Sequence, residues 1–173
     1  MAMVREVADE RDALLAFLAE QRAALRRSVL NLTEQTATSR PLVSELTLAG
    51  LVKHVAGVER NWLDIVRGVH IGDRGPVHAL GPGETVAQAL AELAEVAART
   101  EDQVRELDLD QPVDVGLQGH PLVAGKVRTV RWVLLHLITE LARHAGHADL
   151  LRESLDGATA FQLVAAAGDP LIT

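Results

Sequence analysis

Four potential metal ligands recur at helical spacing in residues 130–156. His136, Glu140, His144 and His147 follow one another at steps of four, four and three residues. Residues three or four apart lie on one face of an α-helix, so these side chains project from a single stripe. The stripe borders the apolar face of that helix, which predicts that His144 lies deepest and Glu140 next, with the other two histidines nearer to solvent. Histidine and carboxylate groups at this spacing are typical of a helix that supplies two ligands to a divalent ion.

A second helix can supply the third ligand. His54 lies beside the apolar face of a helix predicted over residues 47–68, where half of its imidazole should be buried. Together with the Glu140–His144 pair it would hold an ion by three side chains and leave a fourth position for water or substrate. We therefore predict a metal centre at His54, Glu140 and His144.

An ion held in this way has two chemical uses. It lowers the pKa of a bound water to about 7, or it keeps an incoming thiol as its thiolate. Nitrogen and carboxylate donors suit zinc, nickel, iron and manganese alike, so the donor set leaves the metal open. A purely structural interpretation also stays open, in which Glu140 pairs with Arg143 or Arg131 in a solvated charge stripe and nothing is bound.

Glu59 is a charged residue in an apolar sector of the helix predicted over residues 47–68. A carboxylate is costly to bury there unless it meets a donor or a positive charge. We predict that Glu59 accepts a hydrogen bond from a ligand histidine and so orients that ring.

Four helical segments must position these residues. Apolar residues recur at three- and four-residue steps in residues 6–32, 47–68, 84–107 and 129–157. This periodicity favours an all-α fold, a four-helix bundle in which inward-facing side chains build the site. Thr47 and Thr129 are predicted N-caps, and Gly68 and Gly157 are predicted helix ends.

The segments between these helices are rich in glycine and proline. Residues 69–83 indicate a loop, in which His70 and His78 are expected to face solvent. Residues 108–128, between the third and fourth helices, predict a long loop of the kind that often serves as a lid. A short strand at Val113–Val115 is the alternative to a plain loop there.

Composition narrows the function classes. A chain of 173 residues with 48% hydrophobic and 24% charged side chains fits one globular domain, which we place at residues 1–157, with residues 158–173 as a tail packed on the bundle or on a partner subunit. Aromatic residues make up only 2%, so Leu, Val and Ala must fill the core, which favours helices. With 17 basic against 24 acidic side chains and a net charge of −7, a nucleic-acid partner is not expected.

The chain contains no cysteine. Disulfides, cysteine-ligated zinc and a cysteine nucleophile are therefore excluded, and any thiol chemistry needs a thiol from solution. The first residues carry acidic side chains where a signal peptide would need a basic and then an apolar run, and no apolar stretch is long enough to span a membrane. We expect a cytoplasmic protein.

Two motifs resemble a known family. The stretches LVKHVAGVERNWL (residues 51–63) and HLITELARHAGHADLLRESLDGAT (residues 136–159) are similar to the DinB-like superfamily. More narrowly, they resemble its actinobacterial branch of mycothiol-dependent enzymes, the maleylpyruvate isomerase-like proteins. The combination of a histidine in the first motif with Glu-x-x-x-His-x-Gly-His-x-Asp in the second is what makes the resemblance specific.

The resemblance implies a four-helix bundle with a bound divalent metal, zinc in the first place and nickel or another metal as the alternative. The implied ligands are His54, Glu140 and His144. Many relatives have histidine where this chain has Glu140, so His147 or His136 is the alternative ligand if Glu140 is not used.

The resemblance also implies a reaction. A low-molecular-weight thiol, mycothiol, would be kept deprotonated by the metal and presented to a small electrophile by a transferase or isomerase. His147 or Glu59 would move the proton, and Arg128, Arg131 and Arg143 would receive a carboxylate or sugar hydroxyls of the thiol unless they are solvated helix charges. A metal-dependent hydrolase and a non-catalytic metal-binding bundle are the alternatives. The alanine-rich helices and the apolar tail would also suit a homodimer.

Overall fold

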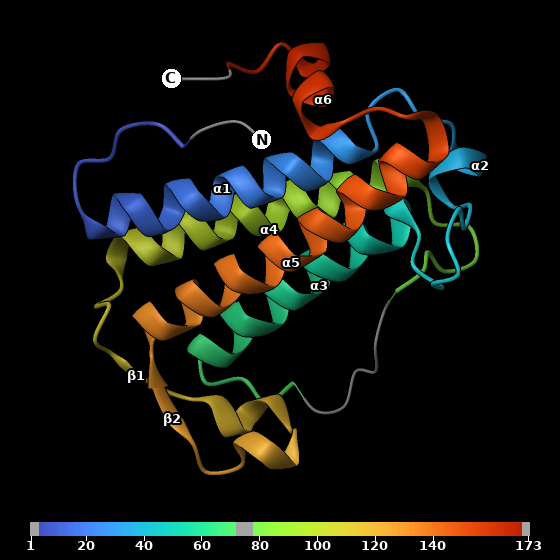
Figure 1. Ribbon diagram of the computed structural model, residues 1–173. Coiled ribbons are helices and arrows are strands. Elements are labelled where there is room, and N and C mark those ends of the chain that lie inside the picture. The colour runs from blue at the N-terminus through green and yellow to red at the C-terminus, as the bar shows by residue number, and fades with distance from the viewer. Residues whose placement is uncertain (1–3, 72–77, 171–173) are drawn as a thin grey trace.

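The computed structural model describes residues 4–71 and 78–170 of the chain. Four long helices lie side by side in a bundle (Figure 1): α1 (Glu10–Ser28), α3 (Leu48–Val66), α4 (Val86–Glu106) and α5 (Val130–Asp156). The short helices α2 (Glu34–Ala37) and α6 (Ala160–Ala167) lie outside it. The predicted all-α four-helix bundle is confirmed. In the described part of the chain, no helix is both long and apolar enough to cross a membrane.

Local capping signals set most helix boundaries. Thr47 and Thr129 are the N-caps of α3 and α5, as predicted, and each side chain accepts a hydrogen bond from a backbone N–H in the first turn. Gly157 ends α5 in the left-handed conformation, with φ of 77°. The prediction for the first helix was wrong at both ends, because Asp9 caps α1 and Asn31 turns the chain with φ of 60°.

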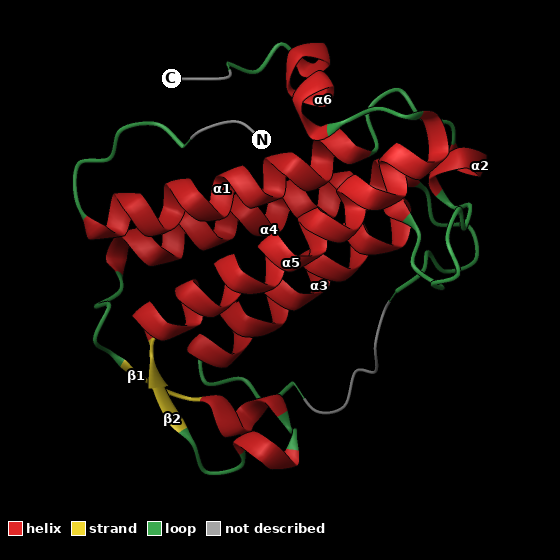
Figure 2. Cartoon of the chain, viewed as in Figure 1, coloured by secondary structure: helices red, strands yellow, loops and turns green. Residues whose placement is uncertain are grey.

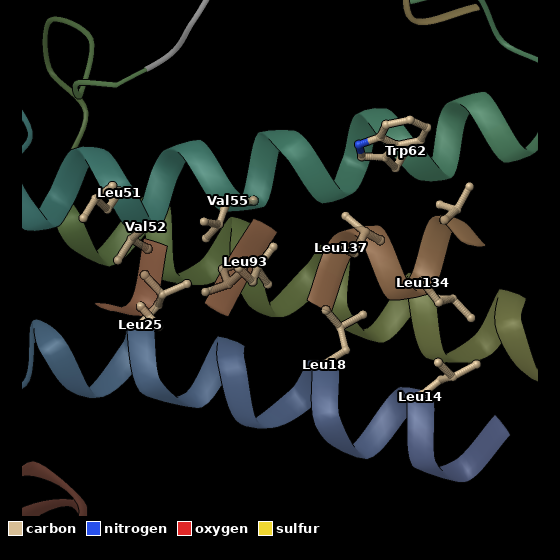
Figure 3. Close-up of a cluster of buried hydrophobic side chains, with 14 of the residues drawn as sticks. Leu14, Leu18, Leu25, Leu51, Val52, Val55, Trp62, Leu93, Leu134 and Leu137 are labelled. Carbon is tan, nitrogen blue, oxygen red and sulfur yellow. The ribbon is translucent and has the colours of Figure 1, made fainter. Parts of the chain in front are cut away.

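Leucine and valine fill the space between the four helices, as the composition predicts. Figure 3 shows side chains from all four pointing into this common core. The fully buried side chains include Leu18 and Leu25 of α1, Leu51 of α3 and Leu137 of α5. Each contributes roughly 1.5–3 kcal/mol by leaving water. This core fixes α3 and α5, which carry the predicted ligands, next to each other.

The linker between α4 and α5 is more ordered than a plain loop. Its strand β1 (Pro112–Asp114) pairs antiparallel with β2 (Val127–Thr129), as Figure 2 shows, and two 3-10 turns, η1 (Val115–Gln118) and η2 (Pro121–Val123), lie between them. Val113 and Val115 are buried, which explains the strand. The favoured prediction of a plain loop was therefore wrong, and the alternative of a short strand is confirmed within a residue.

The tail after α5 packs on the bundle. Helix α6 contacts α1, buries Leu163 and Val164, and begins with a capping box between Thr159 and Gln162. Arg27 of α1 donates a hydrogen bond of 2.8 Å to the carboxylate of Asp169 beyond the end of α6. The division of the chain into a folding unit of residues 1–157 and an appended tail remains a proposal.

Candidate metal centre

Three side chains from two neighbouring helices converge at one point. His54 comes from α3, and Glu140 and His144 come from α5 one turn apart. One nitrogen of each histidine and one carboxylate oxygen all lie within 4.8 Å of one another. The rings of His54 and His144 are 4.6 Å apart between centroids and meet edge to face at 70°. The structure therefore brings together the three residues that the sequence analysis selected.

The packing of α5 explains the depth of each group. His144 lies between the buried residues Leu141 and Ala145, and its side chain is 11% exposed, whereas that of Glu140 is 30% exposed. This is the order of depth that the helical spacing predicts. The centre is thus closed on the core side by apolar side chains and partly open on the side of the carboxylate.

Burial and the Glu140 carboxylate act in opposite directions on the pKa of His144. Burial lowers the pKa of its imidazole, the nearby Glu140 carboxylate raises it, and the charges of His147 and His78 lower it further. The balance is a lowered pKa, which favours the neutral imidazole that binds metal ions. Glu140 Oε1 lies 3.3 Å from His144 Nε2, so the two groups are already in contact.

The residues fit a divalent ion. Two imidazoles and one carboxylate are a common ligand set for zinc and for other first-row metals. The Nδ1 atom of His144 is buried and has no hydrogen-bond partner within the described residues. Burying a nitrogen without a hydrogen-bond partner costs free energy. Coordination of an ion by this centre would use imidazole nitrogens that the protein itself leaves without a partner.

The competing charge stripe is not formed. Arg131 donates to Glu10, with Nε 2.6 Å from Oε1, and pairs with Asp110 rather than with Glu140. Arg143 is exposed, and no ion pair joins it to Glu140 in the part of the chain that the structure describes. Glu140 is instead directed at His144.

Two further histidines of α5 lie beside the centre. The His147 ring is 5.5 Å from that of His144, and its buried Nδ1 has no hydrogen-bond partner among the described residues. His136 lies a turn before Glu140, where it stacks on Trp132 at 5.1 Å and meets the edge of Trp62 at 4.9 Å. Neither ring belongs to the converging group of three.

Glu59 lies elsewhere than predicted. Its side chain is fully buried and accepts hydrogen bonds from Arg22 of α1 and from the hydroxyl of Thr100 of α4. The cost of burying this carboxylate in an apolar sector is thus offset by hydrogen bonds from a guanidinium and a hydroxyl, not by a hydrogen bond from a ligand histidine. Both of its oxygens accept hydrogen bonds from Arg22, so Glu59 does not orient a ligand histidine or move the thiol proton.

The arginines expected to receive substrate differ in their surroundings. Arg131 is engaged in ion pairs with two carboxylates, as described above. Arg128 is exposed, and its guanidinium carbon lies 5.5 Å from the centre of the Trp132 ring. Arg128 and Arg143 therefore remain free of carboxylate partners within the described residues, whereas Arg131 does not.

Sequence reasoning missed His78. It was expected to face solvent like His70, and it is exposed, but its ring lies 4.5 Å from that of His54. The only signal for this contact is Gly50, one turn before His54 in α3. A Cβ at Gly50 would come within 2.0 Å of the carbonyl oxygen of His78.

A family model matches most of the chain. The family model described as mycothiol-S-transferase matches residues 13–157, a span that contains all three converging side chains and nearly all of the bundle. None of the curated proteins compared with the chain matches it.

Proposed function

The chain belongs to the mycothiol-S-transferase family, and we propose from this membership that it joins the sulfur of mycothiol to a small electrophile at a metal centre held by His54, Glu140 and His144. The observation that carries the proposal is the convergence of these three donors within 4.8 Å inside the matched span. The superfamily expected from the two sequence motifs is confirmed by this match.

The metal would supply what the side chains of this protein lack. The chain has no cysteine and must therefore use the thiol of its cosubstrate. A bound zinc ion, or a nickel ion as the alternative, would hold that sulfur as a thiolate near neutral pH. We propose zinc because two imidazoles and one carboxylate that leave a fourth position open are a usual catalytic zinc site.

The side chains have separate tasks in this proposal. His54 and His144 hold the centre from two helices, so their separation is fixed by the packing of α3 on α5. Glu140 contributes the negative charge and faces the more open side. His147 is our candidate for accepting the thiol proton, because its Nδ1 is buried beside His144 without a partner among the described residues.

The proposed transfer conserves atoms and charge. The thiol gives its proton to His147, the sulfur forms a bond to an electrophilic carbon, and the bond to the displaced group breaks with its electron pair. In an addition to a conjugated double bond, the electron pair instead moves to the neighbouring carbon, which takes the proton back. A reaction that depends on a reduced thiol fits a cytoplasmic location, which we also propose. The homodimer expected from the apolar tail stays a prediction.

A thiol-dependence assay tests the proposed function. The metal-loaded protein is mixed with a haloaromatic electrophile and with mycothiol, glutathione or no thiol, and product formation is followed. We expect turnover that requires mycothiol and that falls at least about tenfold in His54→Ala, because a catalytic metal needs its full set of ligands.

The matched control is His70→Ala, which removes an exposed histidine outside the centre and should leave the rate unchanged. Turnover of an ester or amide at the same rate with and without thiol would favour the hydrolase alternative. Equal rates for wild type and His54→Ala would overturn the proposal.

A further inference from the structure

His78 stands beside the metal centre from the segment that joins α3 to α4, of which residues 72–77 lie outside the described part. The centroid of its ring is 4.5 Å from that of His54, and the two ring planes are tilted by 37°. The separation of His54 and His144, two of the proposed ligands, is 4.6 Å. His78 is thus as close to His54 as one ligand is to another.

Gly50 fixes the backbone that carries His78. A Cβ at this position would meet the carbonyl oxygen of His78 at 2.0 Å and its carbonyl carbon at 2.7 Å. Both are backbone atoms and cannot rotate away, so the segment can rest on α3 only where residue 50 lacks a side chain. Glycine inside a helix destabilises it by about 1 kcal/mol relative to alanine. At position 50 the missing side chain is what allows the close approach of the His78 backbone.

The two contacts of residue 78 lie on one face of α3. Gly50 and His54 are four residues apart, so the helix presents them one turn above the other. The backbone of residue 78 rests on Gly50 while its imidazole lies against the ring of His54.

We propose that His78 is a fourth nitrogen donor of the metal centre, which completes the ligand set of the resting protein and gives up its place to the sulfur of the thiol. This inference rests on the metal centre of the proposed function. His78 suits an exchangeable role because its side chain is exposed and comes from a loop, whereas His54 and His144 are held by the bundle. It lies outside the group of three whose donor atoms are mutually within 4.8 Å, so it would join the set by a movement of its own side chain.

Cobalt binding to the metal-free full-length protein tests this proposal. Cobalt(II) replaces zinc and absorbs visible light with an intensity and wavelength that depend on the number and kind of ligands. We expect His78→Ala to bind cobalt at least about tenfold more weakly than wild type, with an altered spectrum, because a donor has been lost. With saturating mycothiol, the spectra of wild type and His78→Ala should become the same, because the thiol has displaced His78 in the wild type.

Two glycine variants test whether cobalt binding depends on where the His78 backbone lies, with the imidazole itself still present. Gly50→Ala keeps His78 but puts a methyl group where its carbonyl oxygen lies, so it should weaken cobalt binding as His78→Ala does. Gly57→Ala is the matched control in the same helix, because a Cβ there meets nothing nearer than 3.8 Å. It should bind cobalt as the wild type does.

The outcomes distinguish the two levels of the proposal. A wild-type protein that binds no cobalt would overturn the metal centre and His78 with it. A wild type that binds cobalt with the same affinity and spectrum as His78→Ala would overturn the role of His78 alone. Spectra that still differ under saturating thiol would show that His78 is not displaced.

Discussion

Arg22 and Glu59 form a two-point ion pair inside the bundle. The Nε atom of Arg22 donates to Oε2 of Glu59 at 2.9 Å, and Nη2 donates to Oε1 at 2.6 Å, with both side chains at most 6% exposed. Thr100 also donates to the carboxylate, and Glu101 lies 3.3 Å from Nη1 of Arg22. The pair therefore ties α1 to α3 and α4 at a buried position in the bundle.

Removing one partner of this pair should destabilise the protein strongly. Glu59→Ala leaves a buried guanidinium with only one carboxylate nearby, and a broken buried pair typically costs about 3–5 kcal/mol. For a chain of this length that is a fall in Tm of roughly 6–20 °C. Thermal unfolding followed by circular dichroism measures it. Metal content should not change in the folded fraction, because Glu59 is not a ligand.

Two variants control this prediction. The double variant Arg22→Met with Glu59→Leu removes both charges and should recover most of the loss, since apolar residues of similar size often replace a buried pair without cost. Arg131→Met breaks exposed ion pairs, which contribute little to stability, and should lower the Tm far less than Glu59→Ala does. A Tm for Glu59→Ala as high as that of Arg131→Met would contradict the structural role given to Glu59.

Replacing the partly buried carboxyl of Asp149 by a neutral amide should stabilise the protein at neutral pH. It lines a cavity of about 270 Å³ between α1, α5 and α6, and burial raises the pKa of its carboxyl above the ordinary value of 3.8. The folded state therefore keeps its proton to a higher pH than the unfolded state, and stability falls as the pH rises from about 3.8 through the raised pKa. Asp149→Asn should raise the Tm at pH 7, by about 2–4 °C for each kcal/mol gained.

The gain from Asp149→Asn should shrink as the pH is lowered through the raised pKa, because the wild-type carboxyl of the folded state then takes up its proton. Melting curves of both proteins over this range give the comparison. Asp102→Asn, at an exposed site on α4, is the control for the substitution itself and should leave the Tm at pH 7 close to that of the wild type. A lower Tm for Asp149→Asn at neutral pH would argue against the assigned burial effect.

Protonation of His136 should change the fluorescence of the two tryptophans that its ring contacts. The chain has two Trp and no Tyr, and both tryptophans contact the His136 ring. Burial lowers the pKa of His136 below 6.5, and the charge of Glu140 opposes the shift without cancelling it. Because a protonated imidazole quenches a stacked indole, fluorescence of the metal-free protein should fall with a midpoint below pH 6.5 as the solution is acidified.

The His136→Gln variant should lose this fluorescence step, whereas His70→Gln should keep it. Arg128, whose guanidinium lies over Trp132, is charged throughout this pH range and should not add a step of its own. A midpoint at or above pH 6.5, or a step that persists in His136→Gln, would contradict the assignment.

Local signals explain which parts of the fold could be predicted. Thr47, Thr129 and Gly157 mark helix ends by interactions within one turn, so their roles are readable from the sequence. The pairing of Pro112–Asp114 with Val127–Thr129 cannot be read from the sequence, because β2 lacks the alternation of apolar residues that would identify a strand. A strand partner of that kind is decided by tertiary packing.

The same distinction applies to the site. Glu140 and His144 share one helix, so their spacing alone places them together, and His54 follows from the apolar face of its own helix. The Arg22–Glu59 pair joins residues 37 positions apart on different helices. His78 reaches His54 through a backbone contact at Gly50 that no side-chain pattern encodes.

The metal content of the purified protein tests the central claim most directly. Protein produced with zinc and nickel both available is analysed by mass spectrometry for metal bound per chain, alongside His54→Ala, His144→Ala and the control His70→Ala. The three converging donors predict about one divalent ion per chain in wild type and in His70→Ala, and a loss of most of it in the other two variants. Wild-type protein without metal, or His54→Ala with the wild-type metal content and Tm, would contradict the account.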